Sequence, residues 1–220
     1  GLAISAITSR EDPRDCYIAK DGQTGLKDAR QGAVIGTSSL RRCAQLLKYR
    51  PDLQLEPLRG NLNTRMTKLE QQELDGIILA AAGVERMGWG DRITERLSTE
   101  ICLPAVGQGS IGIEIRSEDR EVYEIVQTLN HFPSQAAITA ERALLKKLEG
   151  GCQIPIGSLG IVEGEELTLQ GVVASLDGRD LLRTSLSGPV NNAGMLGDKL
   201  AERLIEMGAD RILKSVRQEF

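Results

Sequence analysis

Between residues 34 and 80, three short apolar segments alternate with two stretches of helical periodicity, and no other feature of the sequence limits the fold as much. The strand-like segments are 34–37, 53–56 and 76–80. The last, Gly-Ile-Ile-Leu-Ala, lacks polar alternation, which is typical of parallel strands buried on both faces. The helical stretches are 38–49 and 61–73. This β-α-β-α-β order predicts a doubly wound α/β domain.

The last third of the chain has a different pattern. Its strand-like runs are 156–162, 166–174 and 181–187. The Asp177-Gly178 pair between the last two runs is a strong hairpin signal. The helical stretches that follow are 193–207 and 209–218, with Gly208 as the expected stop between them. This order predicts a small α+β domain in which a three-stranded antiparallel sheet carries helices on one face.

The remaining segments connect these two parts. Strands are expected at 1–7 and 110–115, and helices at 117–129 and 134–148. Ser117 and Ser134 are the expected N-caps of those helices, and Pro104–Gly109 is the expected hinge. Paired carboxylates can do acid–base work, but we interpret the charged Arg10–Asp15 loop as a structural turn that links domains through salt bridges. His131 lies in a loop and receives no role.

Composition excludes several classes of protein. The net charge is −4, from 27 basic and 31 acidic residues, so a general nucleic-acid-binding surface is not expected. The four cysteines show no CxxC spacing and the chain has one histidine, so neither a zinc site nor a disulfide framework is expected. A reducing cytosol, and hence a cytoplasmic protein, fits that cysteine usage. No apolar run is long enough to predict a membrane span.

Arginines follow each of the three strands of the predicted α/β domain, accompanied by small hydroxyl residues and a glycine. The set comprises Thr37, Ser38, Ser39, Arg41, Arg42, Arg59, Gly60, Arg65 and Arg86. Ligands of open α/β sheets bind outside the carboxyl ends of the strands, and helix N-termini attract anions. Guanidinium groups bind carboxylates and phosphates in bidentate fashion. The pattern favours a cleft for a polyanion over three separate solvated helix faces.

Cys152 lies in the run Gly-Gly-Cys-Gln-Ile-Pro that follows a predicted helix. The glycines and the proline indicate a loop, and a loop thiol is available for covalent chemistry. A lone cysteine is usually a buried small hydrophobe, and the residues alone leave both interpretations open. Cys16, Cys43 and Cys102 lack such a setting, and we interpret them as structural.

The motifs occur in the order found in hydroxymethylbilane synthases, also called porphobilinogen deaminases, and the sequence resembles that family over essentially its whole length. The motifs that carry the resemblance are the three arginine clusters, the cysteine loop, Arg10–Asp15, Pro104–Gly109 and Ala140–Ala143. Several separate motifs in one order are far more specific than any single short pattern.

The resemblance implies a transferase of haem and tetrapyrrole biosynthesis, which joins four porphobilinogen molecules into hydroxymethylbilane and releases ammonia. It also implies a dipyrromethane cofactor bonded to Cys152 through a thioether. Further cofactor-binding residues would be Thr37, Ser38, Ser39, Arg41, Arg42, Arg59 and Gly60, and substrate-binding residues Arg65, Arg86 and Gln108. The family implies a monomer that passes its product to uroporphyrinogen-III synthase.

The resemblance places the catalytic aspartate in a Leu-Lys-Asp segment shortly before the position of Gly1. We therefore expect most of the first domain to be missing, no catalytic residue in these 220 residues, and no activity of the chain alone. The implied domains are a remnant of the first (1–14), a second, periplasmic-binding-protein-like domain (15–103), a hinge with a return segment of the first (104–131), and a third domain (132–220).

Two other functions remain open from the residues. A non-catalytic anion-binding module of solute-receptor type would share the α/β domain and would leave Cys152 unmodified. A phosphate-ester transferase would bind phosphate at Ser38 and Ser39, although no Walker-type lysine pattern lies nearby.

Overall fold

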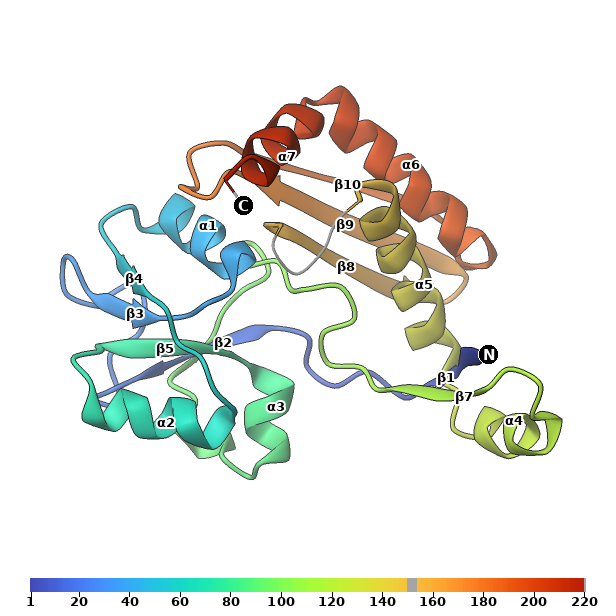
Figure 1. The fold of residues 1–220 in the computed structure, drawn as a ribbon, viewed down its shortest axis with the longest axis horizontal. Coiled ribbons are helices and arrows are strands. Elements are labelled where there is room, and N and C mark those ends of the chain that lie inside the picture. The colour runs from blue at the N-terminus through green and yellow to red at the C-terminus, as the bar shows by residue number, and fades with distance from the viewer. Residues whose placement is uncertain (150–153, 220) are drawn as a thin grey trace.

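The computed structural model describes residues 1–149 and 154–219 of the chain. Its elements form three groups in space: a five-stranded sheet with three helices, a three-stranded sheet with three helices, and a two-stranded pair with one helix (Figure 1). This is a mixed α/β architecture, as the sequence predicts. No helix in these two stretches is both long and apolar enough to cross a membrane.

The five-stranded sheet has the order β4-β3-β5-β2-β6. Its strands are β2 (Asp15–Ala19), β3 (Val34–Gly36), β4 (Gln54–Glu56), β5 (Gly76–Ala80) and β6 (Glu95–Arg96). The three strands expected from the sequence are indeed parallel, since β3 runs parallel to both β4 and β5. Strands β2 and β6 were not expected, and β2 is antiparallel to both β5 and β6, which makes the sheet mixed.

Helices cover both faces of this sheet. They are α1 (Leu40–Tyr49), α2 (Leu62–Gln71) and α3 (Ala81–Arg86), followed by the 3-10 helix η1 (Gly90–Arg92). On β5, Ile77 and Leu79 pack into one buried cluster with residues of α2 and α3, while Ile78 packs into another with Leu46 of α1. Both faces of β5 are therefore buried, which explains why its sequence is uniformly apolar.

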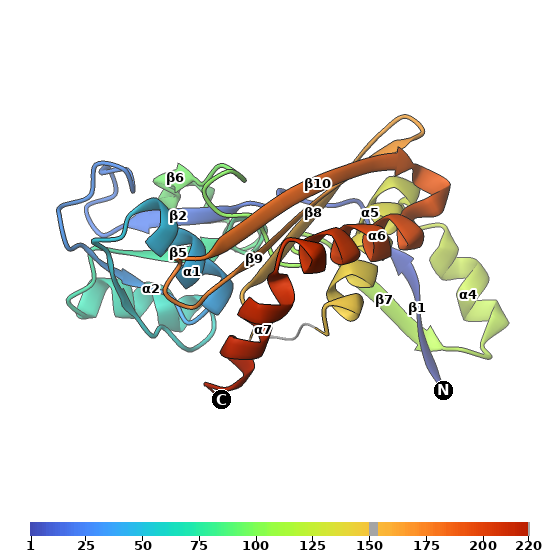
Figure 2. The same ribbon diagram turned by 90° about the horizontal axis from the view of Figure 1, so that it is seen from above.

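The C-terminal part contains the expected antiparallel sheet, in the order β10-β9-β8. Its elements are α5 (Phe132–Lys147), β8 (Ile156–Glu163), β9 (Glu166–Ala174), β10 (Leu181–Pro189), η2 (Val190–Asn192), α6 (Ala193–Glu206) and α7 (Ala209–Arg217). The three helices lie on one face of the sheet, as Figure 2 shows, and share one aliphatic core with it. Gly208 has φ +104° between α6 and α7, so the expected helix stop is confirmed.

The third group pairs β1 (Leu2–Ile7) with β7 (Gly112–Arg116) in antiparallel register, beside α4 (Arg120–Gln127). The two expected helix caps here were wrong. Asp119 caps α4 by accepting from the Val122 amide, and His131 caps α5 by accepting from the Ser134 amide. Asp119 lies two residues after the expected Ser117, and His131 lies three residues before the expected Ser134. An Asx or ring-nitrogen acceptor can cap a helix as well as a serine hydroxyl.

A buried ion pair joins the Arg10–Asp15 loop to the C-terminal part. Glu141 on α5 is 0 % exposed, and its Oε1 accepts a 2.5 Å hydrogen bond from Nη1 of Arg10. The same carboxylate accepts from the backbone amides of Gly107 (2.7 Å) and Gly160 (2.8 Å). The expected salt bridge from this loop is present at Arg10, which pairs with Glu141 on α5, whereas the division into domains stays a prediction.

We predict that Glu141→Gln lowers the free energy of unfolding by at least about 2 kcal/mol, because an amide can accept at only one oxygen and its NH₂ group would face buried donors. Urea denaturation of the chain at pH 7 measures this. Glu202→Gln is the matched control, since Glu202 forms a largely exposed pair with Lys147, and such a pair contributes about 1 kcal/mol or less. Equal losses for the two variants would contradict the prediction.

Candidate functional site

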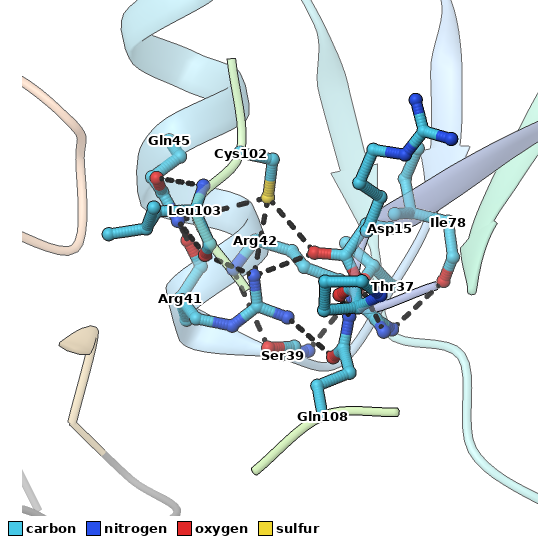
Figure 3. A network of polar contacts seen from close by, with 12 residues as sticks. Asp15, Thr37, Ser39, Arg41, Arg42, Gln45, Ile78, Cys102, Leu103 and Gln108 are labelled. Carbon is cyan, nitrogen blue, oxygen red and sulfur yellow. Dashed lines mark hydrogen bonds and ion pairs between the residues drawn. The ribbon is translucent and has the colours of Figure 1, made fainter. Parts of the chain in front are cut away.

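The centre of the site is Asp15, a fully buried carboxylate that binds two buried arginines (Figure 3). Its Oδ2 lies 2.7 Å from Nη1 of Arg41, and its Oδ1 lies 2.8 Å from Nη2 of Arg42. Burial alone would raise the pKa of Asp15, but the two guanidinium groups outweigh it and hold the pKa well below its usual range. Asp15 is the first residue of β2 and lies beside Ala80, the last residue of β5, so this cluster occupies the carboxyl edge of the parallel strands.

Backbone carbonyl groups hold the same two arginines. Nη1 of Arg41 donates to the Leu103 carbonyl oxygen at 2.7 Å, and Nη1 of Arg42 donates to the Ile78 carbonyl oxygen at 3.0 Å. The residues are 5 % and 7 % exposed. The sequence led us to expect two carboxylate-binding cations here, and the structure shows that much of their donor capacity is already used within the protein.

Gln108 connects this cluster to the 104–109 segment. Its Nε2 donates to the Pro13 carbonyl oxygen at 2.7 Å and to Oδ1 of Asp15 at 3.0 Å. Its Oε1 accepts from Nη2 of Arg41 at 3.3 Å. Nε of Arg10 donates to the Gln108 carbonyl oxygen at 2.9 Å. The amide of Gln108 thus lies beside the arginine pair, and its substrate-binding role stays a prediction.

The hydroxyl residues form the N-terminus of α1. Ser39 is its N-cap and accepts from the Arg42 amide. Thr37 is buried, and its Oγ1 accepts from the Ser39 amide at 3.3 Å. Ser38, between them, is exposed. The first amides of a helix have no partner within the helix, so this exposed end of a ten-residue helix can accept an anion.

The other three arginines are more accessible. Arg59 follows β4, Arg65 lies in the second turn of α2, and Arg86 is the last residue of α3. Nε of Arg65 donates to the Gly60 carbonyl oxygen at 2.8 Å. Burial lowers the pKa of Arg65, and the positive charge of Arg42 lowers it further. Within residues 1–149 and 154–219, no carboxylate pairs with Arg59, Arg65 or Arg86.

The expected reactive thiol, Cys152, lies outside the described residues. Cys16 and Cys102 are buried, and burial raises the pKa of each thiol to about 12. Burial also raises the pKa of Cys43. These properties fit the interpretation of the three as structural cysteines. The described part of the chain has no group of three or more His, Cys, Asp or Glu residues that could hold a metal ion.

Leu26-Lys27-Asp28 has the same three residues as the segment in which the resemblance places the catalytic aspartate, but it lies at the other edge of the sheet. It falls between β2 and β3. Because Ala19 at the end of β2 pairs with Gly76 at the start of β5, this loop leaves the sheet at the amino edge of the parallel strands. Asp28 lines a pocket there with Tyr17, Arg30 and Asp75. The register therefore separates Asp28 from the arginine cluster by the length of β5.

Comparison with known proteins agrees with the residue pattern. Residues 1–124 match the family model described as porphobilinogen deaminase, dipyromethane cofactor binding domain, and residues 135–206 match the C-terminal domain of the same family. The chain belongs to the porphobilinogen deaminase family. Porphobilinogen deaminases are transferases, also named hydroxymethylbilane synthases, whose substrate is porphobilinogen and whose cofactor is dipyrromethane.

Individual relatives show the same relationship. The porphobilinogen deaminase of Pelotomaculum thermopropionicum is 53% identical over 219 residues, which is 100% of this chain and 70% of the relative. The porphobilinogen deaminase of Desulforamulus reducens is 54% identical over 217 residues, which is 99% of this chain and 70% of the relative. That of Carboxydothermus hydrogenoformans is 53% identical over 219 residues, again 100% of the chain and 70% of the relative.

Asp15 was not expected at the centre of the site. From the sequence it belongs to a charged turn, whereas in the structure it begins a buried strand whose next residues are Cys-Tyr-Ile-Ala. The available signal was a single acid directly before a short apolar run, with an arginine pair after the next predicted strand. A buried acid of this kind requires cations within reach.

We predict that Asp15→Asn lowers the free energy of unfolding at pH 7 by about 3 kcal/mol, because it leaves two buried guanidinium groups without an anion. The pKa of Asp15 is lowered in the folded protein, so the stabilisation is present above the ordinary carboxyl pKa and is lost as the pH falls. The difference between the two proteins should therefore shrink between about pH 5 and pH 2. Urea denaturation at several pH values measures it.

The exposed Asp91 provides the control. Asp91→Asn should change the free energy of unfolding by about 0.5 kcal/mol or less at every pH. A loss for Asp15→Asn that stays constant down to pH 2 would contradict an ionised Asp15 as the centre of the cluster.

Proposed function

We propose that this chain forms the carboxylate-binding and cofactor-bearing part of a porphobilinogen deaminase that joins four porphobilinogen molecules into hydroxymethylbilane with release of ammonia. The observation that carries the proposal is the arginine cluster at the carboxyl edge of the parallel strands, with the exposed N-terminus of α1 beside it. Each porphobilinogen unit brings an acetate and a propionate, so a growing chain needs many cationic and N–H donors.

The donor set fits a dipyrromethane with several carboxylates. Arg59, Arg65 and Arg86 would bind its carboxylates directly, and the amides near Ser38 would donate to another. Arg41 and Arg42 contribute the positive field and the donors that Asp15 does not use. When bound, the dipyrromethane supplies the pyrrole on which the product is extended. Cys152, for which we propose the covalent attachment, lies outside the described residues.

We propose the same division of the chain as the resemblance implies. Residues 15–103 would be a periplasmic-binding-protein-like second domain, and 132–220 the third. The pairing of β1 with β7 supports the assignment of 1–14 and the return segment within 104–131 to one further domain, since these distant segments form one sheet. A monomer that delivers its product to uroporphyrinogen-III synthase completes the proposal.

In these 220 residues, the Leu-Lys-Asp triplet that the resemblance associates with the catalytic aspartate occurs at Leu26–Asp28. Asp15 is committed to Arg41 and Arg42, and Asp28 lies at the opposite edge of the sheet. We therefore expect these residues alone not to convert porphobilinogen. Rapid turnover by the isolated 220-residue chain would contradict this part of the proposal.

An intact-mass spectrum of the protein expressed from the complete gene tests the covalent cofactor. We expect added mass equal to two linked pyrrole units, and Cys152→Ser should abolish both this mass and the turnover of porphobilinogen. Cys43→Ser is the matched control and should retain both. An unmodified and inactive protein would favour the solute-receptor alternative, and phosphate binding at Ser38 and Ser39 would favour the phosphate-ester transferase.

We predict that Arg59→Gln and Arg86→Gln each raise the KM for porphobilinogen about tenfold, as expected for the loss of one charge-assisted contact. Initial rates of the protein expressed from the complete gene measure this. Arg92→Gln is the control, because Arg92 is exposed and precedes β6 at the amino edge of the parallel strands, where it pairs with Glu70. An equal KM for all three variants would contradict a role of Arg59 and Arg86 in binding porphobilinogen.

A further inference from the structure

The turn between β9 and β10 lies against α1, the helix that begins with the arginine pair. In both Figure 1 and Figure 2 the tip of this hairpin is beside α1. The turn is held by its own hydrogen bonds, from the Gly178 amide to the Ser175 carbonyl oxygen (3.0 Å) and from the Ser175 amide to the Asp180 carbonyl oxygen (2.8 Å). Its conformation is therefore stabilised by hydrogen bonds within the turn and does not depend on the contact with α1.

The contact is made between backbones. Gly178 has φ +70°, and a β-carbon there would overlap the carbonyl oxygen of Ala44 and would lie 2.9 Å from the nitrogen of Lys48. Nζ of Lys48 also donates to the carbonyl oxygen of Arg179 at 3.2 Å. No side chain fits between the turn and the helix, so the position of the turn limits the position of α1 directly.

A second contact links α1 to the same C-terminal sheet. Gln45 exchanges two hydrogen bonds with the backbone of Leu103, at 2.8 and 3.1 Å. Leu103 in turn packs with Leu159 of β8 and Val172 of β9. Helix α1 is thus attached to the C-terminal sheet at Ala44–Lys48 and, through Leu103, at Gln45.

We propose that the β9–β10 turn is a positioning element for the arginine helix, and that Gly178 is its essential residue. The turn fixes the axis of α1, and with it Arg41 and Arg42, relative to the C-terminal domain. The expected effect on turnover rests on the proposed function, whereas the contact between the turn and α1 does not. The relevant partner is the backbone of α1, so any residue with a β-carbon at position 178 should displace the helix.

The test compares Gly178→Asn with Gly164→Asn in the protein expressed from the complete gene. Both glycines occupy hairpin turns with positive φ, at +70° and +62°, but a β-carbon at Gly164 meets nothing within 4 Å. Asparagine accepts positive φ better than most residues. The two variants therefore carry similar backbone strain in their turns. They differ in the overlap of the new β-carbon with α1, which only Gly178→Asn produces.

Hydrogen exchange of α1 gives the decisive measurement, and it needs no activity. In Gly178→Asn, the amides of residues 43–48 should exchange at least about tenfold faster, including that of Cys43, which donates to the Ser39 carbonyl oxygen at the start of the helix. Gly164→Asn should leave them unchanged. Equal exchange of α1 in the two variants, or a change confined to residues 175–180, would overturn the proposal.

Turnover of porphobilinogen tests the catalytic consequence. Displacement of α1 by about 1 Å should lower kcat roughly ten- to a hundredfold, with a smaller change in KM because Arg59, Arg65 and Arg86 lie outside α1. If the unaltered protein carried no cofactor mass and had no turnover, the proposed function would be refuted. The comparison of hydrogen exchange would still decide whether the turn positions α1. If Gly178→Asn does not fold, native-state hydrogen exchange of the unaltered protein decides. The amides of α1 and of residues 175–180 should then open together as urea is raised, and separate opening of the two segments would overturn the proposal.

Discussion

The structure around the site depends on one buried anion that is shared by two buried cations. Asp15 is 0 % exposed, and isolated burial of such a carboxylate would be strongly unfavourable. Arg41 and Arg42 remove that penalty, and the carbonyl oxygens of Leu103 and Ile78 satisfy further guanidinium donors. The same contacts join β2, α1, β5 and the segment before Pro104. The contacts that hold the α/β part together are therefore also the contacts that orient Arg41 and Arg42.

This arrangement divides the arginines into two kinds. Arg41 and Arg42 together with Asp15 carry a net charge of about one, and their orientation is set by the protein. Arg59, Arg65 and Arg86 have no carboxylate partner in the described part of the chain and keep their charge available. The positive charge of Arg42 contributes, after burial, to lowering the pKa of Arg65, so a guanidinium of the first kind repels one of the second. A polycarboxylate would relieve that repulsion, which is a physical reason for it to bind here.

Much of this could be predicted from the sequence, because the governing patterns are local. The apolar segment of β5 predicts a buried parallel strand, and the three C-terminal strands have clear turn signals. Strand β2 was missed because its five residues begin with a charge and its meaning depends on Arg41 and Cys102, 26 and 87 residues away. The contacts of Gln108 could not be predicted from local patterns, since its partners Pro13 and Asp15 lie more than 90 residues away. Contacts between residues so far apart in the sequence produce no periodic pattern from which they could be predicted.

The expected hinge at 104–109 is closely tied to the C-terminal domain. The Ser158 amide donates to the Pro104 carbonyl oxygen at 2.9 Å, and the Gly107 amide donates to Glu141 at 2.7 Å. A β-carbon on Gly157 would lie 2.7 Å from the Leu103 carbonyl oxygen, so this contact is also between backbones. Rotation within this segment would break these hydrogen bonds, one of which ends on the fully buried carboxylate of Glu141. Any domain movement that preserves these bonds must carry residues 104–107 with the C-terminal domain and bend the chain outside them.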